Sequence, residues 1–179
     1  MHGRGKMVWT DGFVYEGERK DGDRHGHGIE NGSNGQFYDG AWKDGRKEGH
    51  GKVVWAGGEY NGEWKEGKQH GRGKKVLKSG DVSEGTWEKG EWQHGYCKRT
   101  FANGDMYNGE MKGHKYHGRG KLEQANGSVY NGVWEEGEWQ RGWGKKVSPN
   151  GNVYEGERER ARGGVQWPRR AQVRHRRLI

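Results

Sequence analysis

A motif of the form Tyr-x-Gly-x-Trp-x-x-Gly recurs along this chain at intervals of 22 to 24 residues, and this repeat limits the fold more than any other feature. The motif starts at Tyr15, Tyr38, Tyr60, Ser83, Tyr107, Tyr130 and Tyr154. A fixed period of this length is typical of a protein built from stacked supersecondary units, in which each unit contacts only its neighbours. We therefore expect a repeat architecture and not a round domain with one central core.

Each copy has a second half in which Gly-x-Gly leads into an apolar residue. The clearest copy reads Tyr60-Asn61-Gly62-Glu63-Trp64-Lys65-Glu66-Gly67-Lys68-Gln69-His70-Gly71-Arg72-Gly73. The chain opens with such a second half alone, at residues 2–9. These residues resemble the MORN repeat family (membrane occupation and recognition nexus). The resemblance covers residues 2–157 and implies about seven repeats with partial first and last copies, followed by an Arg-rich tail at residues 158–179.

Several copies depart from the repeat. The Trp position holds Arg19, Met111 and Arg158, and Ser83 replaces the Tyr of the fourth copy. The fourth and sixth copies carry one extra residue before the second Gly, and the turn Gly of the fifth copy is displaced to Gly113.

The spacing of Tyr, Gly and Trp at positions i, i+2 and i+4 places all three on one face of a β-strand. A Gly-containing turn follows, and the Gly-x-Gly half forms a second strand, so each repeat predicts one β-hairpin. Gly is a poor strand residue, and we expect it here because a bare backbone leaves a slot for a cross-strand ring. The predicted fold is all-β, an elongated, twisted, single-layer antiparallel meander of successive hairpins. The residues assigned to this structural repeat are Tyr15, Gly17, Tyr38, Gly40, Trp42, Tyr60, Gly62, Trp64, Gly85, Trp87, Tyr107, Gly109, Tyr130, Gly132, Trp134, Tyr154 and Gly156.

The composition excludes several protein classes. Only 27% of residues are hydrophobic and 37 of 179 are Gly, yet 10 Trp and 8 Tyr supply large rings that disordered chains lack. No segment approaches the run of about 20 apolar residues that a transmembrane helix needs. The first residues lack the apolar core of a signal peptide, and Cys97 is the single cysteine. A cytoplasmic location is the expectation, and Cys97 is expected to be a buried structural thiol.

The positive charge lies at the C-terminus. Eight Arg and one Glu lie within residues 158–179, so this segment carries nearly all of the net charge of +8 and the repeats are close to neutral. Three interpretations of this segment compete: a disordered solvated end, an anchor for anionic phospholipids, and a nucleic-acid contact. The candidate residues for contact with lipid or a partner are Trp92, Trp139, Trp143, Trp167, Arg169, Arg170, Arg174, Arg176 and Arg177.

No motif predicts catalysis or a cofactor. Gly-x-Gly leads into a strand here, whereas a phosphate loop needs Gly-Lys-Ser/Thr at the start of a helix. His25, His70, His94 and His117 recur before the second Gly of their copies. Equivalent positions in adjacent hairpins lie about 9.6 Å apart, too far for shared zinc ligands. No catalytic, cofactor-binding or metal-binding residue is expected.

The resemblance to MORN proteins implies a non-catalytic scaffold or adaptor that assembles protein partners, next to a membrane or at a cytoskeletal or ciliary structure. The alternative is a targeting region of a phosphatidylinositol-phosphate kinase-like or other multidomain enzyme. Nucleic-acid binding through the Arg-rich tail ranks last. The expected partners are proteins, with anionic phospholipids and a homodimer as further candidates, and no small-molecule substrate is expected. The open strand edges of a meander are the reason to expect self-association.

Overall fold

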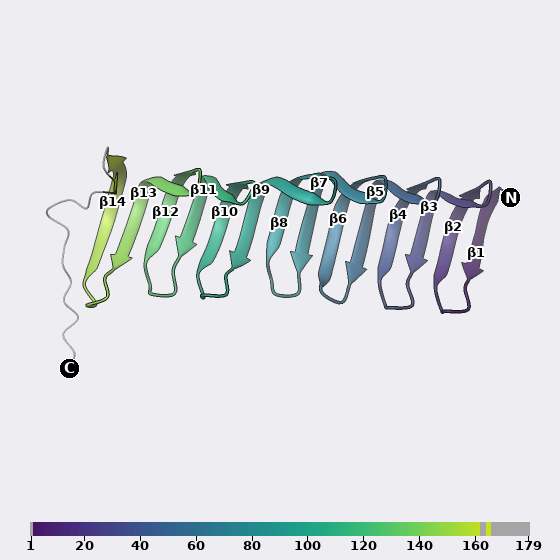
Figure 1. Ribbon diagram of the computed structural model, residues 1–179, viewed down its shortest axis with the longest axis horizontal. Coiled ribbons are helices and arrows are strands. Elements are labelled where there is room, and N and C mark those ends of the chain that lie inside the picture. The colour runs from purple at the N-terminus through teal and green to yellow at the C-terminus, as the bar shows by residue number, and fades with distance from the viewer. Residues whose placement is uncertain (1, 162–163, 166–179) are drawn as a thin grey trace. The chain divides into compact units, whose positions relative to one another are not determined.

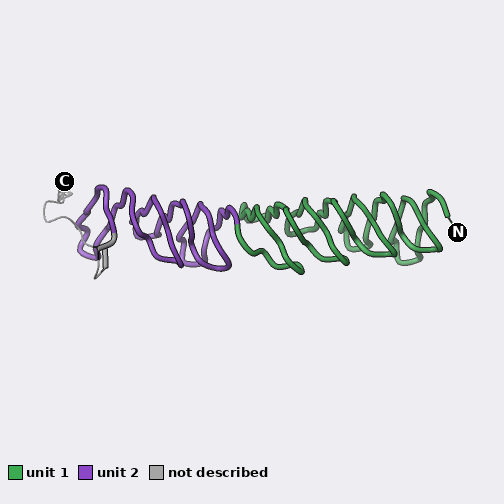
Figure 2. The backbone as a smooth tube through the Cα atoms, turned by 90° about the horizontal axis from the view of Figure 1, so that it is seen from above, with its two compact units in different colours: residues 1–94 green, residues 95–179 purple. Residues whose placement is uncertain are grey.

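The computed structural model describes residues 2–161 and 164–165, and these residues form β-strands joined by turns, without a helix (Figure 1). The chain divides into two compact units, residues 1–94 and 95–179 (Figure 2). Within each unit the strands lie in the sheet in their order along the chain, and successive strands pair antiparallel. The predicted all-β meander of hairpins is confirmed.

The first unit contains β1 (Gly3–Val8), β2 (Val14–Lys20), β3 (Asp23–Asn31), β4 (Phe37–Lys43), β5 (Arg46–Trp55), β6 (Gly58–Lys65), β7 (Lys68–Leu77) and β8 (Val82–Glu88). The second contains β10 (Met106–Lys112), β11 (Lys115–Glu123), β12 (Val129–Glu135), β13 (Glu138–Val147), β14 (Val153–Ala161) and β15 (Gly164–Val165). The division between the units falls within β9 (Glu91–Thr100).

Two-residue turns connect the two strands of each repeat. In the turn between β4 and β5, Asp44 and Gly45 have φ values of 47° and 76°. Positive φ at both central residues is the signature of a type I′ turn, whose twist matches that of the flanking strands. The fifth copy instead places its positive φ, 59°, at Gly113, the first central residue. That position of Gly suits a type II′ turn, which explains why the displaced glycine still closes the hairpin.

Paired glycines allow the repeat Tyr to lie flat across the hairpin. Gly40 of β4 lies opposite Gly51 of β5, and the Tyr38 ring covers this pair. A Cβ atom built on Gly51 would lie only 2.7 Å from Cε2 of Tyr38. The slot predicted from the recurring Gly therefore exists, and it holds the Tyr ring.

A bulge in the second strand of the hairpin is closed by a carboxylate. In the third copy the register shifts after Gly62, and the Arg72 backbone N–H donates to Glu63 Oε1 at 2.9 Å. Glu18 accepts the same kind of bond from the His27 N–H, and Glu110 accepts one from the Arg119 N–H. The Glu between the motif Gly and the motif Trp thus satisfies a donor that the bulge removes from the strand ladder.

The sixth copy, which has one extra residue before the second Gly, keeps a two-residue turn. Gly142 lies opposite Gly132 and takes the place that Gly73 has in the third copy. The second Gly of Gly-x-Gly, Gly144, then lies opposite Tyr130. The bulge of this copy is therefore shorter by one residue, because the first Gly, and not the second, pairs with the motif Gly.

Strand β14 extends past the predicted end of the array at residue 157. β14 continues to Ala161, so it includes the first residues assigned to the Arg-rich tail. Arg158 is 6% exposed and lies on β14 at the position of the motif Trp. Residues 162–163 and 166–179 of the predicted tail lie outside the described residues.

Candidate functional site

One face of the sheet carries the Tyr and Trp side chains of the repeats, and we call it the aromatic face. In the first unit Tyr and Trp rings of successive repeats alternate along the sheet, and neighbouring rings pack edge-to-face. Centroid distances range from 5.1 to 5.6 Å for the pairs Tyr15–Trp42, Tyr38–Trp42, Tyr38–Trp64, Tyr60–Trp64 and Tyr60–Trp87. Edge-to-face packing places the positive rim of one ring on the negative face of its neighbour. The result is a continuous ladder of rings in place of a conventional core.

The side chain of the motif Trp also forms a hydrogen bond to the preceding hairpin. The indole N–H of Trp64 donates to the Gly51 carbonyl oxygen at 2.9 Å, and that of Trp42 donates to the Gly28 carbonyl oxygen at 3.0 Å. Trp134 makes the same bond to Gly120 in the second unit, at 2.9 Å. The motif Trp therefore has two roles: its ring buries apolar area, and its N–H satisfies a carbonyl oxygen beside the Gly slot.

Two cations lie on the ladder in the first unit. The Arg24 guanidinium is 4.2 Å from the centroid of the Trp42 ring, and Lys47 Nζ is 4.4 Å from the centroid of the Tyr38 ring. Both cations pair with the Glu30 carboxylate, whose side chain is 13% exposed. The cation–π contacts and the shared carboxylate together offset the free-energy cost of partly burying these two positive charges.

Neither cation belongs to the Tyr-x-Gly-x-Trp motif, although both occupy one recurring position of the repeat. Arg24 and Lys47 both lie two residues after the turn Gly of their repeat, at the start of the second strand. The same position holds Gln69, Trp92 and Trp139 in later copies, and it holds Tyr116 in the fifth copy, where the turn Gly lies one residue earlier. Alignment of the repeats on the turn, and not on Tyr alone, would have shown one column that is cationic in early copies and aromatic in late copies.

Trp92 and Trp139, two of the candidates for contact with lipid or a partner, belong to this column. Trp139 is 5% exposed and packs 5.8 Å from the Tyr130 ring, and its Cη2 and Cζ2 atoms lie over the bare Gly144. Trp92 is half-buried and packs against the ring ladder of the first unit. Both rings lie on the aromatic face, as Arg24 and Lys47 of the same column do.

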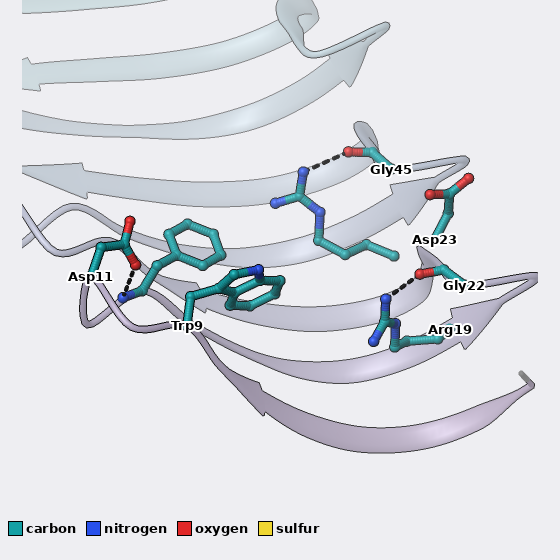
Figure 3. A pocket seen from close by; sticks show the side chains of 8 residues that line it. Trp9, Asp11, Arg19, Gly22, Asp23 and Gly45 are labelled. Atoms are coloured by element: carbon teal, nitrogen blue, oxygen red, sulfur yellow. Dashed lines mark hydrogen bonds between the residues drawn. The ribbon is translucent and has the colours of Figure 1, made fainter.

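A depression opens on the first unit beside the first loop. It has a volume of about 390 Å³ and is lined by Trp9, Asp11, Phe13, Arg19, Gly22, Asp23, Arg24 and Gly45 (Figure 3). Trp9 and Phe13 meet edge-to-face at 4.9 Å, and Trp9 is 39% exposed. Arg24 Nη2 donates to the Gly45 carbonyl oxygen at 2.9 Å, which holds its guanidinium over the depression's rim. The depression offers one exposed ring next to anchored cations and carboxylates.

The aromatic face of the second unit is built differently. Tyr107 stacks on Tyr116 with a centroid distance of 4.0 Å, and Tyr116 meets Trp134 edge-to-face at 5.1 Å. Cys97 is fully buried, as expected for a structural thiol. Aromatic side chains thus occupy the places that cations hold in the first unit.

The repeats identified by these hairpins match a known sequence family. The MORN repeat profile matches residues 1–14, 15–37, 38–59, 60–82, 84–106 and 107–129. The chain belongs to the MORN repeat family. The profile matches end at residue 129, but the MORN-like hairpins continue through β12, β13 and β14.

Other comparisons add little to the family assignment. No curated protein sequence gives a significant match. Among solved structures, the TCP domain of SAS-4 (dCPAP) of Drosophila melanogaster, in complex with a proline-rich motif of Ana2 (dSTIL), is similar over 86% of this chain and 88% of that chain. The sequence identity is 13% and the TM-score is 0.35, so neither the architecture nor the ligand of that domain is transferred to this chain.

The predicted structural residues of the MORN array lie where the repeat places them. Tyr15, Tyr38, Tyr60 and Tyr107 are fully buried, and the motif Trp residues at positions 42, 64, 87 and 134 are 3 to 8% exposed. Tyr130 and Tyr154 are half-buried. Of the residues predicted to contact lipid or a partner, Trp143 is exposed at 41%. Trp167, Arg169, Arg170, Arg174, Arg176 and Arg177 lie outside the described residues.

Within residues 2–161 and 164–165, no group of three or more His, Cys, Asp or Glu side chains is placed to hold a metal ion. MORN repeats are typically non-catalytic. The same part of the chain contains no helix long and apolar enough to cross a membrane.

The buried MORN tyrosines predict loss of stability at alkaline pH. Burial raises the pKa of Tyr60 from 10.0 to about 12, and burial likewise raises the pKa of Tyr38 and Tyr107. The unfolded chain therefore releases these protons at lower pH than the folded chain does, so the stabilisation is complete below pH 10 and is lost as the pH rises toward about 12. Chemical denaturation at a series of alkaline pH values should show this fall, and tyrosinate absorbance should appear together with unfolding. Tyr60→Phe should have a shallower fall, whereas titration of all tyrosines near pH 10 in the folded chain would contradict the prediction.

Proposed function

We propose that this chain is a non-catalytic cytoplasmic scaffold that binds a protein partner at the depression beside Trp9. Family membership supports an interaction module built from repeats. The observation that carries the proposal is the exposed Trp9 ring at a concave site whose neighbours, Phe13 and Arg24, are fixed by packing and hydrogen bonds. A large ring with a rigid surround is the usual anchor of a protein–protein interface.

The chemistry of the depression indicates the kind of segment that would bind. Trp9 and Phe13 offer an apolar surface for one large side chain of the partner. Arg19 and Arg24 lie beside Asp11 and Asp23, so the rim carries both signs of charge and fits a polar peptide backbone better than a uniformly charged polymer. This balance favours a protein segment over a nucleic acid or an anionic membrane as the ligand of this face.

The test compares Trp9→Ala with a matched exposed ring, Trp143→Ala, in quantitative capture of partners from extracts of the source cells. We expect Trp9→Ala to weaken capture of a specific protein by about tenfold or more, as for the loss of an aromatic anchor, and Trp143→Ala to leave it unchanged. Thermal unfolding of both variants serves as the folding control. Equal capture by both variants would contradict a site at Trp9.

Vesicle co-sedimentation separates this function from lipid binding. The full chain and a chain ended after Glu157 are mixed with neutral and with phosphoinositide-containing vesicles at low and physiological salt. We expect neither form to pellet through its repeats at physiological salt. Pelleting of the shorter chain with anionic vesicles would replace the proposed protein site with a lipid-binding sheet, and pelleting of the full chain alone would assign lipid contact to the Arg-rich segment.

A further inference from the structure

Arg19 takes the place of the motif Trp in the first copy, on strand β2. In the second and third copies this place holds Trp42 and Trp64, whose rings pack on the ladder and whose indole N–H groups have carbonyl acceptors. Arg19 is half-buried and lines the depression beside Trp9 (Figure 3). The first copy therefore places a positive charge where the next two copies place an apolar ring.

The guanidinium of Arg19 has no anionic partner in the described part of the chain. Its Nη1 donates to the Met7 sulfur, a weak acceptor, at 3.4 Å, and its Nη2 donates to the Gly22 carbonyl oxygen. The Nε atom is buried and has no acceptor. A partly buried cation without a counter-ion costs free energy, and a ligand that supplied the missing negative charge would recover it.

A second cation faces Arg19 across the hairpin. Arg19 of β2 lies directly opposite Arg24 of β3. In the next copy the cation Lys47 lies opposite the Trp42 ring instead. Like charges on facing strand positions destabilise the pair. The nearby Glu30 carboxylate pairs with Arg24 and Lys47, so it offsets those two charges and leaves that of Arg19 unmet.

The two carboxylates of the depression do not pair with Arg19 either. Asp11 lies in the loop before β2, and its Oδ1 accepts the Phe13 backbone N–H at 3.0 Å. In the view of Figure 3 the Trp9 ring lies between Asp11 and Arg19. Asp23 is exposed and makes no ion pair with Arg19. The charge that lacks a partner at this site is therefore positive, and it lies on Arg19.

The apolar part of the site lies beside this charge. Trp9 is 39% exposed, and its ring is held edge-to-face against Phe13 at 4.9 Å. Both rings line the same depression as the Arg19 guanidinium. A segment that fills the depression thus meets an aromatic surface and an unpaired cation together. A nucleic acid or an anionic membrane would satisfy the charge alone, through phosphates spread over a surface, and would leave the concave ring pair unused.

We propose that the depression beside Trp9 binds a segment of a partner protein in which a carboxylate neighbours a large apolar side chain. This inference rests on the protein-binding site proposed above and specifies what that site recognises. The apolar side chain packs on Trp9 and Phe13, and the Asp or Glu carboxylate of the partner accepts hydrogen bonds from Nη1 and Nη2 of Arg19. Each Nη nitrogen carries a second hydrogen, so the contacts of Arg19 with Met7 and Gly22 are kept. Paired bonds between a guanidinium and a carboxylate add a fixed orientation to the affinity.

The test selects peptides from a displayed library of random sequences on the immobilised full-length chain. We expect the recovered peptides to be enriched in Asp or Glu beside a large apolar residue. A recovered peptide should bind Arg19→Gln about tenfold or more weakly than wild type, because a charged hydrogen-bond donor is lost. Arg19→Lys keeps the charge and should lose less. Arg72→Gln removes an exposed arginine of β7 outside the depression and should bind as wild type does. Thermal unfolding of each variant is the folding control.

A second measurement changes the peptide and leaves the chain intact. Replacement of the peptide carboxylate by its amide should weaken binding to wild type about tenfold but leave binding to Arg19→Gln unchanged, as a double-mutant cycle requires for a direct pair. Equal weakening by Arg72→Gln and Arg19→Gln would indicate general charge attraction and overturn the inference.

The selection also separates this inference from the proposed protein-binding site. Recovered peptides that bind Trp9→Ala weakly but show no enrichment in Asp or Glu would overturn the carboxylate preference and leave the site at Trp9 in place. Peptides that bind Trp9→Ala as well as wild type, or the recovery of none that depends on Trp9, would contradict the site itself and the inference with it.

Discussion

Replacement of Gly51 with alanine is expected to lower the free energy of unfolding by about 3 kcal/mol, in the upper range for overpacking of a core. The added methyl group would lie 2.7 Å from Cε2 of Tyr38, which is itself fully buried under Trp42 and Trp64. The ring has no free volume into which to move, so the strands must separate or the Tyr hydroxyl must leave the Ala41 carbonyl oxygen, to which it donates at 3.0 Å. Chemical denaturation followed by Trp fluorescence measures the change.

Gly5→Ala is the matched control for this substitution. Gly5 holds the same place in the Gly-x-Gly motif of β1, but a Cβ atom there meets no atom within 4 Å. We expect its free energy of unfolding to stay within about 0.5 kcal/mol of wild type, as for ordinary surface substitutions. Comparable losses in both variants would show that Gly acts through backbone freedom and not through the space it leaves for Tyr.

Replacement of Trp64 with alanine is expected to cost about 3 to 5 kcal/mol, the usual range for removal of a large buried aromatic side chain. Trp64 is 8% exposed and contacts the Tyr rings of two successive hairpins. Its loss also leaves the Gly51 carbonyl oxygen without the indole donor at 2.9 Å. Equilibrium denaturation of the full chain provides the measurement.

Two further variants separate the contributions of the buried ring and of its N–H group to the loss of stability in Trp64→Ala. Trp64→Phe keeps an aromatic ring and removes the N–H, so we expect a smaller loss of about 1 to 3 kcal/mol, with an unsatisfied carbonyl oxygen as one part of it. Trp143→Ala removes a ring that is 41% exposed and should change stability far less. If Trp143→Ala lowered the free energy of unfolding as much as Trp64→Ala, the conclusion that stability depends on the ladder of buried rings would be wrong.

These predictions have a common origin in the one-dimensional packing of the sheet. A conventional domain distributes the effect of a substitution over many neighbours, but a ring of the ladder has partners only in its own and the adjacent hairpins. Loss of one ring therefore interrupts the contact between two repeats.

The amino-acid sequence by itself determined the repeat, the hairpin and the side of the strand on which Tyr, Gly and Trp lie. The period of 22 to 24 residues and the i, i+2, i+4 spacing are local properties, because side-chain direction alternates along any strand. The glycine slot followed from the same argument, since only a missing side chain explains so many Gly residues in strands.

Tertiary structure alone decided the pairing register and the contacts of the residues that follow each turn. Arg24 and Lys47 read as ordinary surface charges in the sequence, and only the approach of the adjacent hairpin places them on Trp42 and Tyr38. In the sequence Trp139 looks like an addition to a turn, but in the structure it pairs with Trp134, and its ring contacts Gly144 because Gly142 pairs with Gly132. Spacing along the chain determines on which face of its own strand a residue lies. A bulge shifts the pairing of the residues that follow it. The length of the bulge depends on which glycines can approach each other across the two strands.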